Sequence, residues 1–182
     1  MRYGTRMPGS VMPGRGAFPN GPQSEAMTPN SQILGYLGRA LSLEFSAGQH
    51  YLAQASLAKF RQEMTFAEGF VTLANEEFQH ANRITDRMVA QGALPAGSIL
   101  KPADMANNIV EALQTCEARE WDLIQLYTEA SNFCANVQAT DDQALFNRLL
   151  EEEVTQLNRV QAWLNDYIQS LQQGPSMHRS FV

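Results

Sequence analysis

The sequence predicts an all-α protein, a bundle of four long helices with one long crossover connection between the second and third helices. Three observations lead to this fold class. Four stretches place apolar residues three and four positions apart, which is the spacing of one face of a helix. No stretch shows the alternating pattern of a strand. The 182 residues, 44% of them hydrophobic, are enough for one domain with a substantial core.

The first predicted helix covers residues 31–61 and opens a helical domain of residues 31–173. It follows an N-terminal extension, residues 1–30, that is rich in Gly, Pro and Met. Because the extension shows no periodicity, we expect either a flexible tail or a segment that docks on a partner protein or a neighbouring subunit.

The second helix is predicted over residues 66–92, because Thr65 and Glu68 form a capping box and Gly92 can end a helix. The linker that follows, residues 92–103, contains Pro and Gly. Its roughly 12 residues can span about 40 Å when extended, and a helix of about 27 residues has a similar length. The linker can therefore run the length of the bundle, which predicts a topology with one crossover.

The third and fourth helices are predicted over residues 104–137 and 141–172. Thr140 and Gln143 form a second capping box between them. The short connections make the first two helices antiparallel neighbours, and likewise the last two. Residues 174–182, which begin with Gly-Pro, are expected to be a short C-terminal tail.

The charge and the composition exclude several classes of protein. A net charge of −6 and a pI near 5.0 argue against a nucleic-acid partner, which would require a basic face. No apolar run approaches the roughly 20 residues of a membrane span, and no signal peptide is evident, so we expect a cytoplasmic protein. Cys116 and Cys134 fall on one predicted helix about 27 Å apart, too far for a disulfide, and we expect two thiols in a reducing compartment.

A Glu-x-x-His pair, Glu77 and His80, lies on the apolar face of the second helix, in the segment Asn-Glu-Glu-Phe-Gln-His. A buried carboxylate is costly unless it is paired or bound to a metal. Each of the other helices also places a Glu in the middle of its apolar face, namely Glu44, Glu120 and Glu153. An ion pair of Glu77 with His80 and no metal is the alternative interpretation.

Four carboxylates that converge in a core cannot all be ionised without cations. Carboxylate and imidazole ligands at an open site suit iron or manganese. A dinuclear site explains the number of carboxylates, because two can bridge the metals while each of the others binds one metal.

The two halves of the sequence repeat with an offset of 76 positions, which predicts a pseudo-twofold axis and places the four carboxylates at a similar depth. The offset relates Glu44 to Glu120, Tyr51 to Tyr127, Glu77 to Glu153 and His80 to Gln156.

The polar neighbours of these carboxylates allow more than one role. We expect Tyr51 and Tyr127 to be core residues whose hydroxyls bond the carboxylates, with a redox role for tyrosine as the alternative. Gln156 is either a metal ligand, a partner of a ligand, or an ordinary hydrogen-bonding core residue. His50 falls one position off the apolar face and is expected at the surface or in an interface.

The Glu44…Glu77-x-x-His80…Glu120…Glu153 pattern resembles the ferritin-like superfamily, and bacterioferritin most of all. Two shorter stretches also resemble that family: Gln-His-Ala-Asn-Arg at residues 79–83 is similar to its Lys-His-Ala-Asp-Arg, and Gly-Ala-Leu-Pro at residues 92–95 is similar to its Gly-Leu-Pro. The resemblance extends over residues 31–172.

The resemblance implies a set of iron ligands. Glu44 and His80 would hold one iron and Glu120 the other, while Glu77 and Glu153 would bridge them. Members of the family bind Fe(II) and oxidise it with O2 or H2O2, and many store ferric mineral inside a hollow shell.

Three features depart from the bacterioferritin pattern. Gln156 stands where that family has a second His, which predicts an asymmetric site with a weaker second metal. Phe78 stands where the haem-ligating Met would be, so no haem is expected. Residues 174–182 match the fifth short helix of the cage-forming relatives poorly, and the extension of residues 1–30 is foreign to the family pattern.

We therefore expect a ferritin-like di-iron carboxylate protein that binds and oxidises Fe(II) for storage or detoxification, acting as a homo-oligomer. Two other functions are compatible with the sequence. One is a non-catalytic adaptor or structural subunit that docks on a larger assembly through its tails. The other is a di-iron or di-manganese oxidase or oxygenase that acts on an organic substrate, which would require an apolar pocket or channel at the site.

Overall fold

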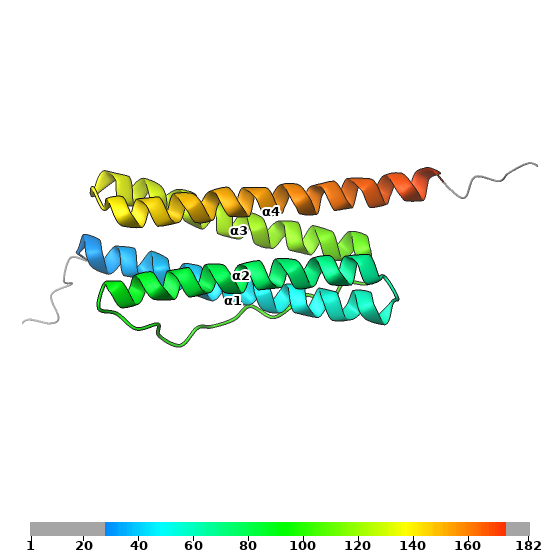
Figure 1. Ribbon diagram of the computed structural model, residues 1–182, viewed down its shortest axis with the longest axis horizontal. Helices are drawn as coiled ribbons and strands as arrows, with labels where there is room; N and C mark the ends of the chain where they lie inside the picture. Colours follow the sequence, from blue (N-terminus) through cyan, green and yellow to red (C-terminus); the bar gives the residue numbers. More distant parts are fainter. Residues whose placement is uncertain (1–27, 174–182) are drawn as a thin grey trace, which may run out of the picture.

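The computed structural model describes residues 28–173, which form four helices and contain no strand (Figure 1). The element bounds are α1 Pro29–Phe60, α2 Met64–Ala90, α3 Ile109–Asn136 and α4 Thr140–Gln173. The all-α fold class is confirmed. Most of the predicted N-terminal extension and the whole predicted tail of residues 174–182 lie outside the described residues.

The helices pack as two antiparallel hairpins, α1 with α2 and α3 with α4 (Figure 1). The connection between α2 and α3 runs along the side of the bundle and returns the chain to the opposite end. As a result α3 runs parallel to α2 and antiparallel to α1. The predicted topology with one crossover is therefore confirmed.

The crossover comprises residues 91–108, which is longer than the predicted linker because α3 begins at Ile109 rather than near residue 104. Polar groups fasten it to the bundle. The Ser46 hydroxyl accepts a hydrogen bond from the Lys101 N–H at 3.0 Å, and the Gln54 side chain donates to the Asp104 carbonyl at 2.8 Å. The Asn108 side chain then caps α3. These partners satisfy backbone groups that the extended segment cannot pair within itself.

Neither predicted capping box is formed. Gln62 adopts a positive φ of 63° after α1, so the chain turns sharply and α2 already begins at Met64, with Glu63 at the cap position and no side-chain cap. Before α4, the Gln143 N–H donates to the Ala139 carbonyl, whereas the capping box would have had it donate to the Thr140 hydroxyl. The backbone turn therefore sets both helix starts. The α1 helix also begins earlier than predicted, at Pro29, because Thr28 caps it.

The two interhelix turns repeat with the offset found in the sequence. Gln138, in the turn before α4, has a φ of 58°, and Gln62 occupies the equivalent turn of the first hairpin. Two residues that are not glycine adopt the left-handed conformation, which is uncommon, at positions 76 apart. The predicted internal repeat therefore extends from side chains to backbone conformation.

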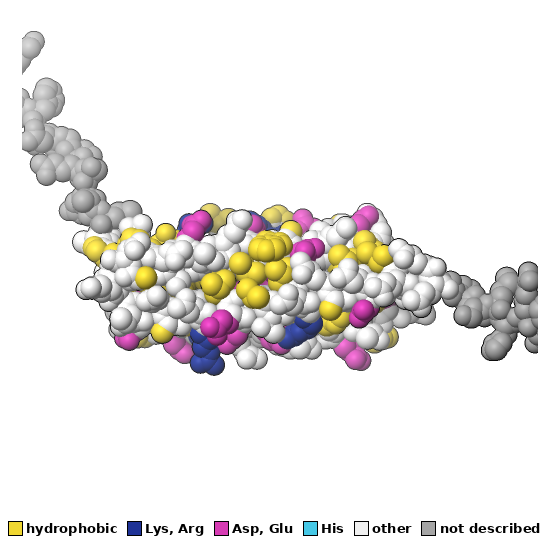
Figure 2. All heavy atoms as spheres, turned by 90° about the horizontal axis from the view of Figure 1, so that it is seen from above, with side chains coloured by type: hydrophobic (Ala, Val, Ile, Leu, Met, Phe, Trp, Pro, Cys, Tyr) yellow, Lys and Arg dark blue, Asp and Glu magenta, His cyan; other side chains and the backbone are white. Residues whose placement is uncertain are grey.

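The bundle core consists of aliphatic and aromatic side chains above and below a polar middle. Phe70 and Phe146, both fully buried, lie next to the buried tyrosines. Outside the core, Trp121 on α3 is 47% exposed and Val154 on α4 is 41% exposed. Figure 2, seen from the α4 side, shows hydrophobic side chains gathered near the middle of this face. Across residues 28–173 no helix is both long and apolar enough to cross a membrane.

A buried carboxylate and histidine cluster

The middle of the bundle contains four glutamates, one from each helix, whose side chains are fully buried: Glu44, Glu77, Glu120 and Glu153. Oxygens of Glu44, Glu77 and Glu153 and a ring nitrogen of His80 all lie within 4.8 Å of one another. Glu120, on α3, is not part of this closest group, but it is fully buried and its charge helps to raise the pKa of Glu77. The structure thus brings four of the residues singled out by the sequence pattern into one group and places Glu120 beside them.

Most polar atoms of this cluster have no hydrogen-bond partner among the described residues. Both oxygens of Glu77 and of Glu153, one oxygen of Glu44 and of Glu120, and Nδ1 of His80 are buried and unpaired. Buried polar groups in native proteins are nearly always paired. So many acceptors facing one another require retained protons or a bound cation, and they offer the oxygen and nitrogen ligand atoms that iron and manganese prefer.

Burial and mutual repulsion shift the proton affinities of the carboxylates. Burial, followed by the charges of Glu153 and Glu44, raises the pKa of Glu77 well above its usual range. Burial, followed by the charge of Glu153, does the same to the pKa of Glu120. The pKa of Glu153 rises to about 7, because burial and Glu44 outweigh the opposing effect of His80. Without a metal, the cluster therefore retains protons that a cation would displace.

His80 joins the cluster through Nδ1, which lies 2.6 Å from Glu153 Oε1 and 3.4 Å from Glu44 Oε1. Burial lowers the pKa of His80, but contacts with Glu153 and Glu44 outweigh it and raise the pKa to about 10. The atom Nδ1 forms no well-aligned hydrogen bond despite these short distances. It is therefore the ring nitrogen placed to bind a metal.

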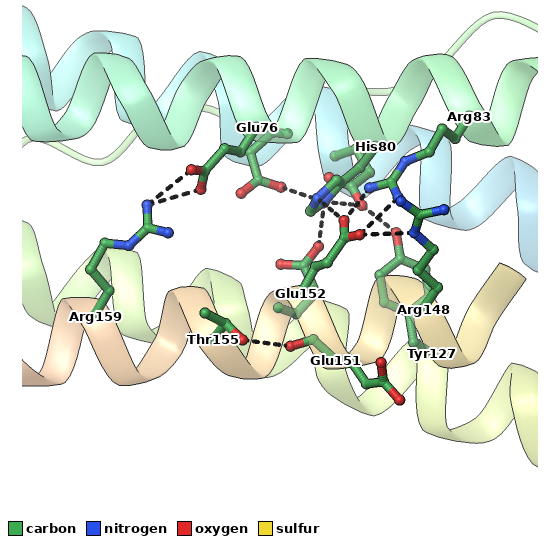
Figure 3. A network of polar contacts seen from close by, with 12 residues as sticks. Glu76, His80, Arg83, Tyr127, Arg148, Glu151, Glu152, Thr155 and Arg159 are labelled. Atoms are coloured by element: carbon green, nitrogen blue, oxygen red, sulfur yellow. Dashed lines mark hydrogen bonds and ion pairs between the residues drawn. The ribbon is translucent and has the colours of Figure 1, made fainter.

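The other ring nitrogen of His80 contacts Glu152, a residue that the sequence pattern did not single out. Nε2 lies 3.0 Å from Glu152 Oε2, and Glu152 in turn accepts hydrogen bonds from Arg83 and Arg148. Figure 3 shows the two arginines converging on Glu152 from α2 and α4. Such an outer contact fixes the orientation of a metal-binding imidazole. Because Glu152 follows another Glu in a charged run, its sequence position alone did not indicate this contact.

The tyrosine hydroxyls bond the carboxylates, as expected, and they do so across the two halves of the bundle. Tyr51 of α1 donates to Glu120 of α3, and Tyr127 of α3 donates to Glu44 of α1. The two contacts are related by the internal repeat. Each hydroxyl pairs one oxygen of its carboxylate and leaves the other oxygen facing the cluster.

Gln156, the counterpart of His80 in the second half, is 2% exposed, and its Oε1 is unpaired. The cluster therefore has one imidazole and, at the equivalent position, one neutral amide oxygen. This asymmetry follows directly from the sequence repeat.

The expectation that His50 lies at the surface or in an interface is wrong, since His50 is fully buried within the chain itself. The crossover covers this face of α1: His50 Nδ1 accepts a hydrogen bond from the Asp104 N–H at 3.3 Å, and Nε2 lies 3.1 Å from Thr115 Oγ1. Burial and the charge of Arg119 lower the pKa of His50 to about 4. His50 is therefore neutral near pH 7 and belongs to the crossover contacts, separate from the carboxylate and histidine cluster.

Comparison with known proteins identifies the family. The sequence matches the ferritin-like domain family over residues 34–169. The chain belongs to the ferritin-like family. Bacterioferritin from Rhodobacter capsulatus is 26% identical over 127 residues, which span 70% of this ferritin-like chain and 79% of that protein. The buried cluster in a ferritin-like bundle indicates a carboxylate metal site of the dinuclear type.

A solved structure of Rhodobacter capsulatus bacterioferritin has the same fold. It matches with a TM-score of 0.74 at 24% identity, covering 76% of this ferritin-like chain and 87% of that chain. That bacterioferritin is described with a metal-free dinuclear site and a haem iron. In this ferritin-like chain Phe78 lies close to Gly48 and Phe45 and offers no ligand atom. The expectation that haem does not bind here stays a prediction.

Proposed function

We propose that this protein binds two Fe(II) ions in the buried cluster and oxidises them with O2 or H2O2, in iron storage or detoxification. One observation carries the proposal: four fully buried glutamates from four helices point unpaired oxygens at one another and at Nδ1 of His80. A protein that used these side chains only for structure would pair them, because unpaired buried carboxyls destabilise a fold.

Following the ferritin-like pattern, we assign Glu44 and His80 to one iron, Glu120 to the other, and Glu77 and Glu153 to bridging positions. Paired iron supplies two electrons, which together with two protons reduce O2 to H2O2. Manganese fits the same donor set.

The surrounding residues orient the ligands. Tyr51 and Tyr127 each hold one carboxylate oxygen by donating a hydrogen bond, which leaves the second oxygen free for a metal. Glu152 fixes the ring of His80 so that Nδ1 faces the cluster. The close approach of Tyr51 to the cluster also supports a role in supplying an electron during oxidation.

The neutral oxygen of Gln156 is a weaker ligand than imidazole, so we assign the weaker metal to its side of the cluster. This asymmetry is consistent with one tightly held and one exchangeable iron. Oxidised iron could then leave from the weaker side for storage.

The cavity that reaches the cluster supports a small ionic substrate over an organic one. It has a volume of about 320 Å³, and it is lined by side chains that all carry polar groups, including Gln79, Thr155 and Gln156. An oxygenase acting on an organic substrate would require an apolar pocket there. The adaptor alternative rests on the two tails, most of whose residues lie outside the described part of the chain. Assembly as a homo-oligomer and a cytoplasmic location remain part of this proposal.

The proposal is tested by anaerobic titration of the metal-free protein with Fe(II), counting metal per chain, followed by exposure to O2. Two irons per chain that oxidise rapidly are expected. The Glu77→Ala variant removes one bridging carboxylate and should abolish paired binding, whereas Glu151→Ala, which alters an exposed residue of the same charged run, should leave it intact.

The assignment is wrong if Glu77→Ala retains the full stoichiometry and rate of the unaltered protein. A protein that binds no iron at all would make the four glutamates a structural remnant and favour the adaptor function.

A further inference from the structure

A polar cavity opens between α2 and α4 on one side of the metal cluster. We call it the α2/α4 cavity and define it by Glu76, Gln79, His80, Thr155, Gln156 and Arg159. Its volume is about 320 Å³. His80 and Gln156, which are 3% and 2% exposed, are the only members of the cluster region that are not fully buried, and both line this cavity. The cavity therefore meets the cluster at its least covered point.

Along the bundle axis, aromatic rings lie on both sides of the cluster. Tyr51 lies one way along the bundle and stacks at 6.5 Å from Phe70, while Tyr127 lies the other way at 6.0 Å from Phe146. Because α1 and α3 run antiparallel, the two tyrosines flank the cluster on opposite sides along the bundle axis. A larger cavity, of about 770 Å³ between α1, α3 and the crossover, has no cluster residue among its lining residues.

Two ion pairs between α2 and α4 border the α2/α4 cavity (Figure 3). At one end Arg159 Nη1 donates to both oxygens of Glu76 at 3.0 Å. At the other end Arg83 and Glu152 are paired, and Glu152 also contacts His80. The Glu152 pair therefore helps to position a candidate ligand. No hydrogen bond or ion pair joins Glu76 or Arg159 to a cluster residue among the described residues, so the pair can be removed without altering the ligand set.

We propose that the α2/α4 cavity is the port through which a hydrated divalent cation reaches the cluster, and that the Glu76–Arg159 ion pair is its latch. The inference rests on the proposed function, because it assumes that the cluster binds metal. Amide, hydroxyl and carboxylate oxygens of the lining can replace water molecules of the cation one at a time. Both latch side chains are about one-third exposed, so the pair is weak enough to open repeatedly.

An ion pair that opens and closes the α2/α4 cavity changes the rates of cation binding and release but leaves the affinity of the cluster for the cation unchanged. When the latch opens more often, the cation enters and leaves more often by the same factor, while the ligands and the dissociation constant stay the same. Loss of a partly exposed ion pair should change the open fraction by roughly fivefold, which corresponds to about 1 kcal/mol.

The test uses Co(II) as a spectroscopic probe of the full-length, metal-free protein, with stopped-flow association and chelator-driven dissociation. The double variant Glu76→Gln with Arg159→Gln removes the latch and conserves the net charge. The matched control is Arg87→Gln with Asp142→Asn, which removes another α2–α4 ion pair, of 2.6 Å, away from the α2/α4 cavity. Thermal unfolding verifies that each variant is folded.

We expect both rate constants to rise about threefold to tenfold in the latch variant, with a dissociation constant within twofold of the unaltered protein and with control rates unchanged. Unchanged rates in the latch variant, or an equal increase in the control, overturn the port while leaving the proposed function intact. If the unaltered protein binds no Co(II) or Fe(II), the proposed function and the port both fail.

Discussion

Replacing Glu77 with glutamine should make the metal-free protein more stable and should remove the stabilisation that metal provides. Both oxygens of Glu77 are buried without a partner, and the charges of Glu153 and Glu44 oppose its ionisation. The metal-free fold therefore contains an unfavourable carboxyl group, which must either stay protonated or carry an unfavourable charge. An amide of the same shape is neutral at every pH and brings two N–H donors for neighbouring carboxylates.

The size of the effect follows from the cost of an unsatisfied buried polar group. That cost is about 1–3 kcal/mol, and for a chain of this length each kcal/mol shifts Tm by roughly 2–4 °C. Metal-free Glu77→Gln should therefore melt about 2–12 °C above the unaltered protein. An exposed change in the same charged run, Glu151→Gln, should stay within about 0.5 kcal/mol.

The assay is thermal and urea unfolding of both proteins, first with a chelator and then with Co(II) or anaerobic Fe(II). Metal should raise the Tm of the unaltered protein, because a ligand that binds only the folded state stabilises it. The variant should gain much less. A metal-free variant that melts below the unaltered protein would show that Glu77 is satisfied in the native fold, and would refute the reasoning.

The remaining predictions concern the crossover, the asymmetry of the site and the packing of the helices. Burial lowers the pKa of His50 to about 4 in the folded protein, against an ordinary value of 6.5. The contribution of neutral His50 to stability is therefore present above pH 6.5 and is lost as the pH falls toward 4, by up to about 3 kcal/mol. Urea unfolding compared across pH should show a smaller loss in His50→Gln. Gln156→His should tighten the weaker metal site severalfold in a Co(II) titration, since imidazole replaces an amide oxygen; an unchanged affinity would place Gln156 outside the ligand set. Gly69→Ala places a Cβ 2.7 Å from the ring of Trp163 and should lower the free energy of unfolding by about 1–3 kcal/mol. Gly35→Ala meets no atom within 4 Å and should raise the free energy of unfolding by up to about 1 kcal/mol, because alanine favours the helix. Equal unfolding free energies for these two alanine variants would contradict the packing.

Where sequence reasoning failed, the missing information was spatial. His50 was expected at the surface or in an interface because helical periodicity describes only the faces that helices bury against one another. The crossover that covers His50 has no periodicity, so its path is invisible in the sequence. The same reason explains Glu152, whose contact with His80 depends on how closely α2 approaches α4. The capping boxes at Thr65 and Thr140 failed because the left-handed turn residues set the helix starts first.

The sequence by itself determined the four helices, the single crossover, the internal repeat and the set of residues in the cluster. It could do so because each of these depends on spacing along one chain: a helix turns every 3.6 residues, and a charged residue on an apolar face must be buried with it. Only the tertiary structure decided which tyrosine holds which carboxylate, that Nδ1 of His80 faces the cluster, and where the cluster is open to solvent. Those features depend on distances between helices, which the periodicity of each helix does not specify.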